Sequence, residues 1–142
     1  MSPDCVFCRI VAGAASARMV ARFPDVVAFL PLRPAVLGHT LVVPKGHVAG
    51  IDGLDRSTAH ALTDAVLDVA ARVQAVVRPA GLNVVQSTGL AATQSVSHLH
   101  VHVVPRTVGD GLPALWPLPR EWPAGELDVI AQRLASAVWA VR

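Results

Sequence analysis

Residues 98–104 of the chain read His98-Leu99-His100-Val101-His102-Val103-Val104, so histidine alternates with an aliphatic residue. Side chains alternate between the two faces of a β-strand, which would put the three histidines on one face, about 7 Å apart, and the aliphatic residues on the core side. Imidazole can act as a nucleophile, a general acid or a metal ligand near neutral pH. The stretch therefore predicts a strand whose histidines take part in catalysis or metal binding.

Two kinds of chemistry fit a row of histidines. One is phosphoryl or nucleotidyl transfer through a phosphohistidine-type intermediate, and the other is metal-assisted hydrolysis with the histidines as ligands. The preceding residues 89–95 form a short polar segment that contains glycine. Such a loop can offer backbone N–H groups, the Gln94 amide and the Ser95 hydroxyl to an anion beside the imidazoles. A phosphate fits this loop better than a bare metal ion.

The rest of the chain predicts an α+β fold with an antiparallel sheet. We expect a hairpin of two strands within residues 19–32, and further strands at 39–43, 82–86 and 95–104. A long helix should begin at Asp55 or Ser57 and end before Pro79. A C-terminal helix is expected from the helical spacing of Leu127, Ile130, Leu134 and Val138.

The length of 142 residues predicts one domain, residues 1–142, with a core motif region at 5–111. Residues 109–142 add a segment rich in proline and tryptophan, expected to pack as an ordered loop, and then the C-terminal helix. Hydrophobic residues make up 53% of the chain and charged residues 15%, so polar surface is scarce. A second copy of the chain is the simplest cover for the remaining apolar surface.

Charge and hydropathy exclude several classes of partner. The net charge is only +2 and the basic residues are scattered, which argues against a nucleic acid polymer. Neither a secretory signal nor an apolar run of about 18 residues is found, so we expect a cytoplasmic protein without a membrane partner. Reducing conditions there disfavour a disulfide between Cys5 and Cys8, which leaves metal ligands or buried thiols.

Three segments together resemble the histidine triad (HIT) superfamily, and specifically its Hint-like bacterial branch: residues 5–10 (Cys-Val-Phe-Cys-Arg-Ile), 38–45 (Gly-His-Thr-Leu-Val-Val-Pro-Lys) with His47, and 94–106 around the histidine row. The resemblance implies a five-stranded antiparallel sheet with one long and one C-terminal helix, and a homodimer whose sheets join. It also implies cleavage of a nucleoside phosphate bonded at phosphorus to an amine or a further phosphate, with no metal needed for catalysis.

The resemblance also implies roles for individual residues. His100 would be the nucleophile and carry the nucleotide, His102 would contact the phosphate or the leaving atom, and His39 and His98 would complete the catalytic set. The residues matched to the phosphate side are Gln94, Ser95, Asn83, Ser87 and Thr93, and those matched to the base pocket are Phe7, Ile10 and Phe29. Three positions depart from the family pattern: Pro31 replaces a ribose-binding aspartate, Thr93 a glycine and Ser87 an asparagine.

The cysteine pair has a possible role of its own. Cys5, Cys8, His47 and His98 resemble a structural zinc set found in part of the branch, and two thiolates with two imidazoles suit tetrahedral zinc. The alternative is that both cysteines simply pack beside Phe7 and Ile10. Two other functions also stay open: a nucleotide-binding regulatory module with little turnover, and a zinc hydrolase that uses the histidine row as ligands.

Overall fold

The computed structural model describes residues 2–114 and 119–137. The chain divides into two compact units, residues 1–110 and 111–142, and each is described by itself. In chain order the elements are α1 (Val6–Val11), β1 (Arg18–Arg22), β2 (Val26–Leu30), β3 (Thr40–Pro44), η1 (Ile51–Gly53), α2 (Arg56–Val77), β4 (Gly81–Gln86), η2 (Leu90–Ala92), β5 (Val101–Arg106) and α3 (Ala124–Ser136).

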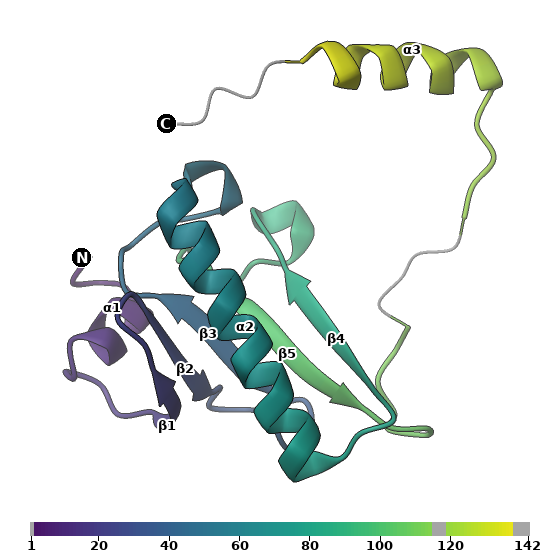
Figure 1. The fold of residues 1–142 in the computed structure, drawn as a ribbon. Coiled ribbons are helices and arrows are strands. Elements are labelled where there is room, and N and C mark those ends of the chain that lie inside the picture. The colour runs from purple at the N-terminus through teal and green to yellow at the C-terminus, as the bar shows by residue number, and fades with distance from the viewer. Residues whose placement is uncertain (1, 115–118, 138–142) are drawn as a thin grey trace. The chain divides into compact units, whose positions relative to one another are not determined.

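The first unit is built on one five-stranded sheet in the order β1-β2-β3-β5-β4 (Figure 1). Every neighbouring pair is antiparallel, which confirms the predicted α+β fold. Strand β5 lies between β3 and β4, so His102 is opposite Leu41 on one side and Val85 on the other. His102 is therefore held by a ladder on both sides, whereas His98 and His100 lie just before the strand.

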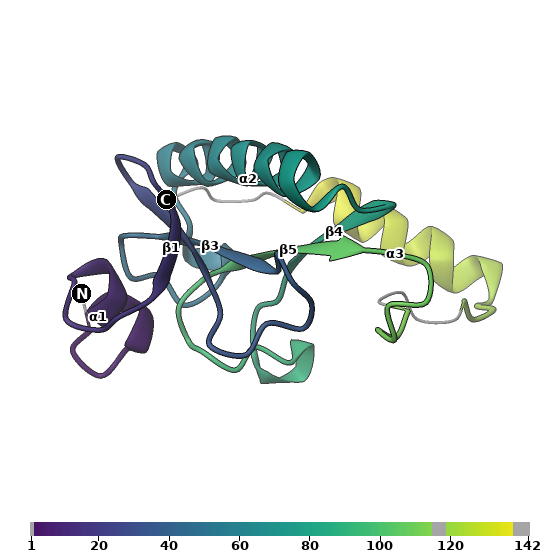
Figure 2. The same cartoon turned by 90° about the horizontal axis from the view of Figure 1, so that it is seen from below.

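The two faces of the sheet bury different sets of side chains. Helix α2 covers one face and α1 lies on the other side (Figure 2). Leu99, Val101 and Val103 belong to the core cluster that packs under α2. The rings of His98 and His100 contact Phe7 of α1, so these histidines lie on the other side of the sheet. The predicted alternation of faces is confirmed.

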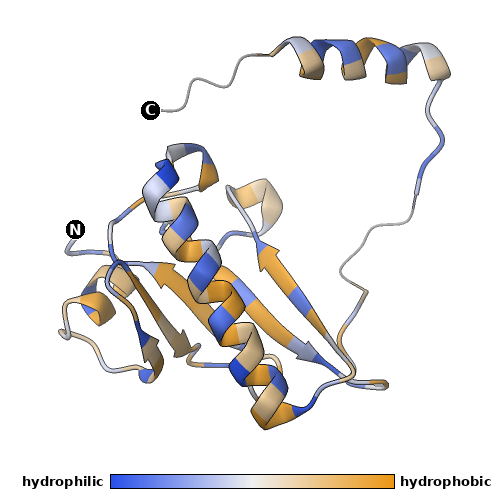
Figure 3. Cartoon of the chain, in the orientation of Figure 1, coloured by the Kyte–Doolittle hydropathy of each residue, from blue (hydrophilic) through white to orange (hydrophobic). Residues whose placement is uncertain are grey.

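Strand β2 and helix α2 contribute to this core with different patterns of apolar residues. Strand β2 is apolar along its length and is buried on both faces, whereas α2 presents apolar residues in turn with polar ones (Figure 3). The helix begins after Asp55, whose carboxylate accepts a hydrogen bond from the Thr58 amide at 2.9 Å. It ends at Val77 and is capped by Arg78, in the left-handed conformation with φ of 51°, directly before Pro79. The predicted ends are confirmed, with Asp55 as the N-cap.

The histidine strand starts later and ends later than predicted. The expected strand was 95–104, but the ladder runs from Val101 to Arg106. Upstream, the amide of His98 bonds to the carbonyl of Val96 at 2.8 Å and that of Leu99 to Val48 at 2.7 Å, so these residues turn instead of pairing with β3. Pro105 is accommodated because the pairs with β3 end at Val103.

The second unit contributes helix α3, which covers most of the predicted C-terminal helix. Its apolar residues Leu127, Ile130 and Leu134 are 50%, 47% and 68% exposed. Val138 of the predicted helix lies outside the described residues, as does Trp116 of the proline-rich segment. Trp122 is 55% exposed. No helix in the described part of the chain is long and apolar enough to cross a membrane.

Candidate functional site

His100 is oriented by the backbone just before it. Its Nδ1 atom lies 2.7 Å from the carbonyl oxygen of His98, and the side chain is 5% exposed. A carbonyl oxygen can only accept a hydrogen bond, so Nδ1 carries the proton. In the neutral ring Nε2 then holds a free lone pair. This is the tautomer that a nucleophilic imidazole needs.

His39 and His102 form a second pair with a defined direction. The amide N–H of Ala35 donates to Nδ1 of His39 at 3.1 Å, so that nitrogen is unprotonated. The Nε2–H of His39 therefore donates to Nδ1 of His102, 2.9 Å away. His102 in turn keeps its proton on Nε2. His100 and His102 thus differ in tautomer: one offers a lone pair at Nε2 and the other an N–H.

Electrostatics keep this pair neutral. Burial lowers the pKa of His102 to about 4, and the neighbouring charges of His100 and His39 act in the same direction. Burial also lowers the pKa of His39. Both rings are therefore uncharged at pH 7, as the hydrogen-bond directions require. The rings of His100 and His102 lie 4.9 Å apart between centroids.

The three residues matched to a base pocket pack together on the α1 side of the sheet. Phe7, Ile10 and Phe29 are only 7%, 8% and 2% exposed. The ring of Phe7 makes edge contacts with Phe29 at 5.5 Å and with His100 at 5.2 Å between centroids. All three belong to one core cluster, and Phe7 lies directly against His100. Their role in binding a base stays a prediction.

The loop before the histidine strand is shaped by Gln94. The Gln94 side chain is buried, its Oε1 accepts from the Gly89 amide at 2.7 Å, and its Nε2 donates to the Ala49 carbonyl at 2.7 Å. The oxygen and the nitrogen of the Gln94 amide are thus both bonded to backbone groups. Thr93 and Ser95 are exposed on the same loop, and Thr93 has a φ of 65°, in the left-handed region that favours glycine.

Two further residues matched to the phosphate side lie on or just after β4. The carbonyl of Ser87 accepts from Nε2 of Gln86 at 2.9 Å. Asn83 lies opposite Val104, and its Oδ1 accepts from Nη1 of Arg106 at 2.7 Å. The structure therefore ties Asn83 to the end of β5 instead of the loop with Gln94.

The sequence analysis did not predict that Arg106 would hydrogen-bond to Asn83. Its guanidinium also pairs with both carboxylate oxygens of Asp110, at 2.7 and 3.2 Å. The available signal was an arginine that closes a strand, with an aspartate four residues later.

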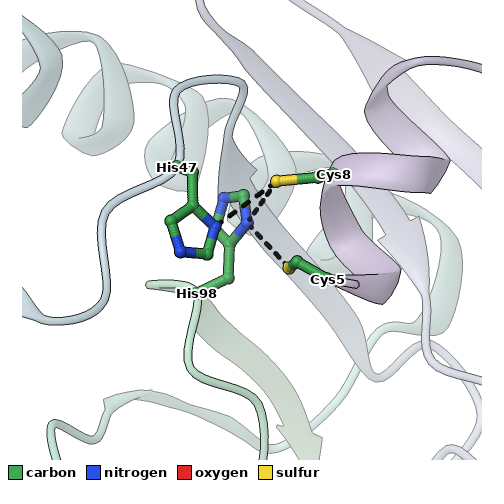
Figure 4. A group of neighbouring side chains, drawn as sticks. All are labelled: Cys5, Cys8, His47 and His98. Carbon is green, nitrogen blue, oxygen red and sulfur yellow. Dashed lines mark hydrogen bonds between the residues drawn. The ribbon is translucent and has the colours of Figure 1, made fainter. Parts of the chain in front are cut away.

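Cys5, Cys8, His47 and His98 meet in one cluster, with all four ligand atoms within 4.8 Å of one another (Figure 4). Nδ1 of His98 lies 3.4 Å from Sγ of Cys5 and 3.6 Å from that of Cys8, and Nδ1 of His47 lies 3.3 Å from Sγ of Cys8. Tetrahedral zinc bonds of about 2.0 to 2.3 Å place neighbouring ligand atoms about 3.3 to 3.8 Å apart. The separations fit a zinc ion.

The protonation of His98 also fits a metal ligand. Its Nε2 lies 2.9 Å from the carbonyl oxygen of Pro44, so Nε2 carries the proton and donates. Nδ1 is left with a lone pair that faces the cysteines. A ligand histidine whose other nitrogen donates to a backbone carbonyl is the usual arrangement at metal sites.

Within the described residues, the three rings of the histidine row are not brought together as one group of metal ligands. Within residues 2–114 and 119–137, the cysteine cluster is the one group of three or more His, Cys, Asp or Glu side chains with ligand atoms that close together. The ring of His98 belongs to that cluster, and its carbonyl oxygen, not its ring, bonds to His100. The structure thus groups one of the three ligands of the zinc hydrolase alternative with the cysteines and His47.

Comparison with known proteins gives the same fold and motif. The HIT domain family matches residues 12–109, more than half of the chain. The chain belongs to the HIT domain family. Among HIT relatives, Protein hit of Bacillus subtilis is 37% identical over 114 residues, covering 80% of this chain and 79% of that protein. Adenosine 5'-monophosphoramidase hnt1 of Schizosaccharomyces pombe is 36% identical over 116 residues, covering 80% and 84%.

Solved HIT structures match as well. A HIT family member from Bacillus subtilis superposes with a TM-score of 0.89 at 32% identity, covering 95% of this chain and 97% of that one. A zinc-bound histidine triad family protein from Mycobacterium smegmatis gives a TM-score of 0.73 at 32% identity, covering 94% and 98%. The predicted family and its five-stranded fold are therefore confirmed.

Proposed function

We propose that this HIT protein cleaves nucleoside phosphate derivatives at the α-phosphate, with His100 as the nucleophile. One observation carries the proposal: the bond from Nδ1 of His100 to the His98 carbonyl leaves the Nε2 lone pair free to attack. The phosphoramidase activity named for the fission yeast relative supports a phosphorus–nitrogen bond as the one broken. A phosphoanhydride, with a further phosphate as leaving group, follows the same chemistry.

The reaction would proceed in two displacements at phosphorus. In the first, Nε2 of His100 forms a bond to the α-phosphorus while the bond to the leaving group breaks, and the leaving group takes up a proton. In the second, water attacks the same phosphorus, loses a proton and releases the nucleoside monophosphate with the neutral imidazole restored. Dividing one difficult step into two easier ones is the advantage of a covalent intermediate.

His102 would act as a hydrogen-bond donor to the reacting phosphate. Its proton is on Nε2 because Nδ1 accepts from His39. With its pKa lowered to about 4, His102 is neutral at pH 7 and offers an N–H without carrying a charge. Fixed donors of this kind stabilise charge that develops on phosphoryl oxygens. The loop held by Gln94, with Ser95 and Thr93 exposed on it, would add further donors.

The cysteine cluster would hold a structural zinc ion. Cys5, Cys8, His47 and His98 would bind it, and bound zinc would cross-link α1 to the segments after β3 and before β5. The zinc-bound relative from Mycobacterium smegmatis supports this assignment. In our proposal the chemistry at phosphorus is carried by His100 and His102, and the reaction needs no cofactor.

A second copy of the chain is the partner we propose for the exposed apolar surface. Strand β4 is at the edge of the sheet, and its Val84 is 54% exposed. An unpaired edge with an apolar side chain favours pairing with another strand. A homodimer whose two sheets join would cover it.

Two departures favour a second candidate function, a nucleotide-binding module with little turnover. Thr93 is β-branched yet has a φ of 65°, which strains the loop that would hold the phosphate. The side chain of Pro31 offers no hydrogen-bond acceptor where the family has a carboxylate. Tight binding of a mononucleotide without hydrolysis would support the module.

Steady-state hydrolysis of an adenosine phosphoramidate separates the two candidates. We expect turnover in the wild type, loss of at least about 1,000-fold in kcat for His100→Ala, and nucleotide affinity within a few-fold of the wild type. His60→Ala is the matched control, because His60 is an exposed histidine on α2. An active His100→Ala protein would refute the proposed nucleophile.

A further inference from the structure

The two cysteines bracket an aromatic residue that touches His100. Phe7 lies between Cys5 and Cys8, and its ring is 7% exposed. The ring centroids of Phe7 and His100 are 5.2 Å apart with the planes at 79°, an edge contact. A second edge contact, at 5.8 Å, joins Phe7 to His98. Phe7 therefore lies against both the proposed nucleophile and a residue of the cysteine cluster.

The position of Phe7 depends on the cluster. Helix α1 has six residues and no side-chain hydrogen bond at its N-cap, so it is too short to be stable by itself. Cys5 lies at that N-cap and Cys8 within the helix, and both reach Nδ1 of His98, while Cys8 also reaches His47. These contacts fix the turn that carries Phe7.

The His100 ring needs contacts from neighbouring side chains to keep its orientation. One hydrogen bond, from Nδ1 to the His98 carbonyl, sets its tautomer, but rotation about the Cβ–Cγ bond of histidine has a broad energy profile. Phe7 and the His102 ring, whose centroid is 4.9 Å away, contact the imidazole and restrict this rotation. An attacking atom must point at phosphorus within narrow limits for the reaction to be fast.

We propose that Phe7 is a positioning residue, which holds the His100 ring in its attacking orientation and is itself held in place by the turn from Cys5 to Cys8. This inference rests on the proposed function, because it gives a purpose to the orientation of His100. It differs from a base-pocket role for Phe7. A wall that binds the base changes KM, whereas a positioning residue changes the rate of attack.

The test compares Phe7→Leu with Val27→Ala. Val27 is fully buried in the same core cluster as Phe7, so its truncation also weakens the core, but its partners across the sheet are Arg22 and Val43. For Phe7→Leu we expect the rate of His100 nucleotidylation and kcat to fall about tenfold, with KM within about twofold of the wild type. Val27→Ala should leave both rates unchanged. Phe7→Met replaces Phe7→Leu if the leucine variant does not fold.

Imidazole NMR of the free protein gives an independent readout. We expect one sharp set of His100 ring signals with protonated Nδ1 in the wild type and in Val27→Ala, and exchange-broadened signals in Phe7→Leu. Cys8→Ser should broaden the same signals if the cysteine turn holds Phe7. A rise in KM alone, unchanged ring signals in Phe7→Leu, or equal losses in Val27→Ala would overturn the inference. If the wild type forms no nucleotidylated His100, the proposed function fails, and the ring spectra still decide whether Phe7 orients His100.

Discussion

Nδ1 of His100 lies 2.7 Å from the carbonyl oxygen of His98, while the ring of His98 points into the cysteine cluster. One residue therefore joins the proposed nucleophile to the proposed zinc site, through its backbone on one side and its side chain on the other.

His39→Ala should lower kcat by about 10- to 100-fold, because His102 loses the donor that fixes its tautomer. Without the Nε2–H of His39, the proton of His102 can move to Nδ1, and the N–H at Nε2 is lost. Nitrogen-15 NMR of the imidazoles at pH 7 should show one His102 tautomer in the wild type and a mixture in the variant. A single unchanged tautomer would contradict this direction of the hydrogen bonds.

Stability should fall as the pH drops from about 6.5 to 4. The pKa of His102 is lowered from 6.5 to about 4 by burial, so between these values the unfolded chain binds a proton that the folded chain does not. The free energy of unfolding therefore decreases with falling pH, and below about pH 4 this residue adds no further loss.

The control for this pH dependence is His102→Gln, which cannot titrate there. Urea unfolding at pH 7, 6, 5 and 4 should give a shallower pH dependence for the variant. The cysteine cluster contributes equally to both proteins, so their difference isolates His102. Parallel curves would show that the pKa of His102 is not lowered in the folded protein.

Purified protein should contain about one zinc ion per chain, and Cys8→Ser should lose it together with thermal stability. Elemental analysis and Tm measure the two effects. A chelator gives the internal control, because it should lower the Tm of the wild type and leave that of Cys8→Ser unchanged. A metal-free wild type with full stability would mean that the cysteines are simply buried thiols.

Ribonucleotide and 2'-deoxyribonucleotide forms of one phosphoramidate should react with similar kcat/KM. The side chain of Pro31, which follows β2, offers no acceptor to the sugar hydroxyls, so no side-chain partner at this position is left unpaired when a hydroxyl is missing. Pro31→Asp should favour the ribose form by roughly 1 to 3 kcal/mol, the range for hydrogen bonds to charged groups.

Pro34→Asp, an exposed proline in the same loop, is the matched control for charge. It should leave the ratio of ribose to deoxyribose unchanged. A strong ribose preference in the wild type would show that another group binds the hydroxyls.

The sequence predicted those features that depend on local periodicity and on residue chemistry. Alternation in residues 98–104 placed the histidines on one face, and the spacing before Pro79 predicted helix α2 with a cap at Asp55 or Ser57, of which the structure uses Asp55. The four members of the cysteine cluster were also predicted, through the resemblance, and they lie together. These features could be predicted because each is specified by a few residues that act locally or by a motif.

Other features depend on where distant backbone lies, which periodicity cannot reveal. The phosphate-side role of Gln94 stays a prediction, but the sequence did not predict that its amide bonds to Gly89 and Ala49, the latter 45 residues away. The start of β5 was misplaced because the amide of Leu99 bonds to Val48. The tautomers of His39 and His102 likewise depend on the backbone amide of Ala35, and that of His100 depends on the backbone carbonyl of His98.

Intact-protein mass spectrometry tests the central claim most directly. Wild-type protein and His100→Ala are mixed with an adenosine phosphoramidate and quenched without acid, since phosphorus–nitrogen bonds to histidine are labile in acid. The account predicts an adduct of one mononucleotide on the wild type, mapped to His100 in the peptide that spans β5, and none on His100→Ala. An adduct on the variant, or rapid hydrolysis by the wild type with no adduct at any time of quenching, would contradict it.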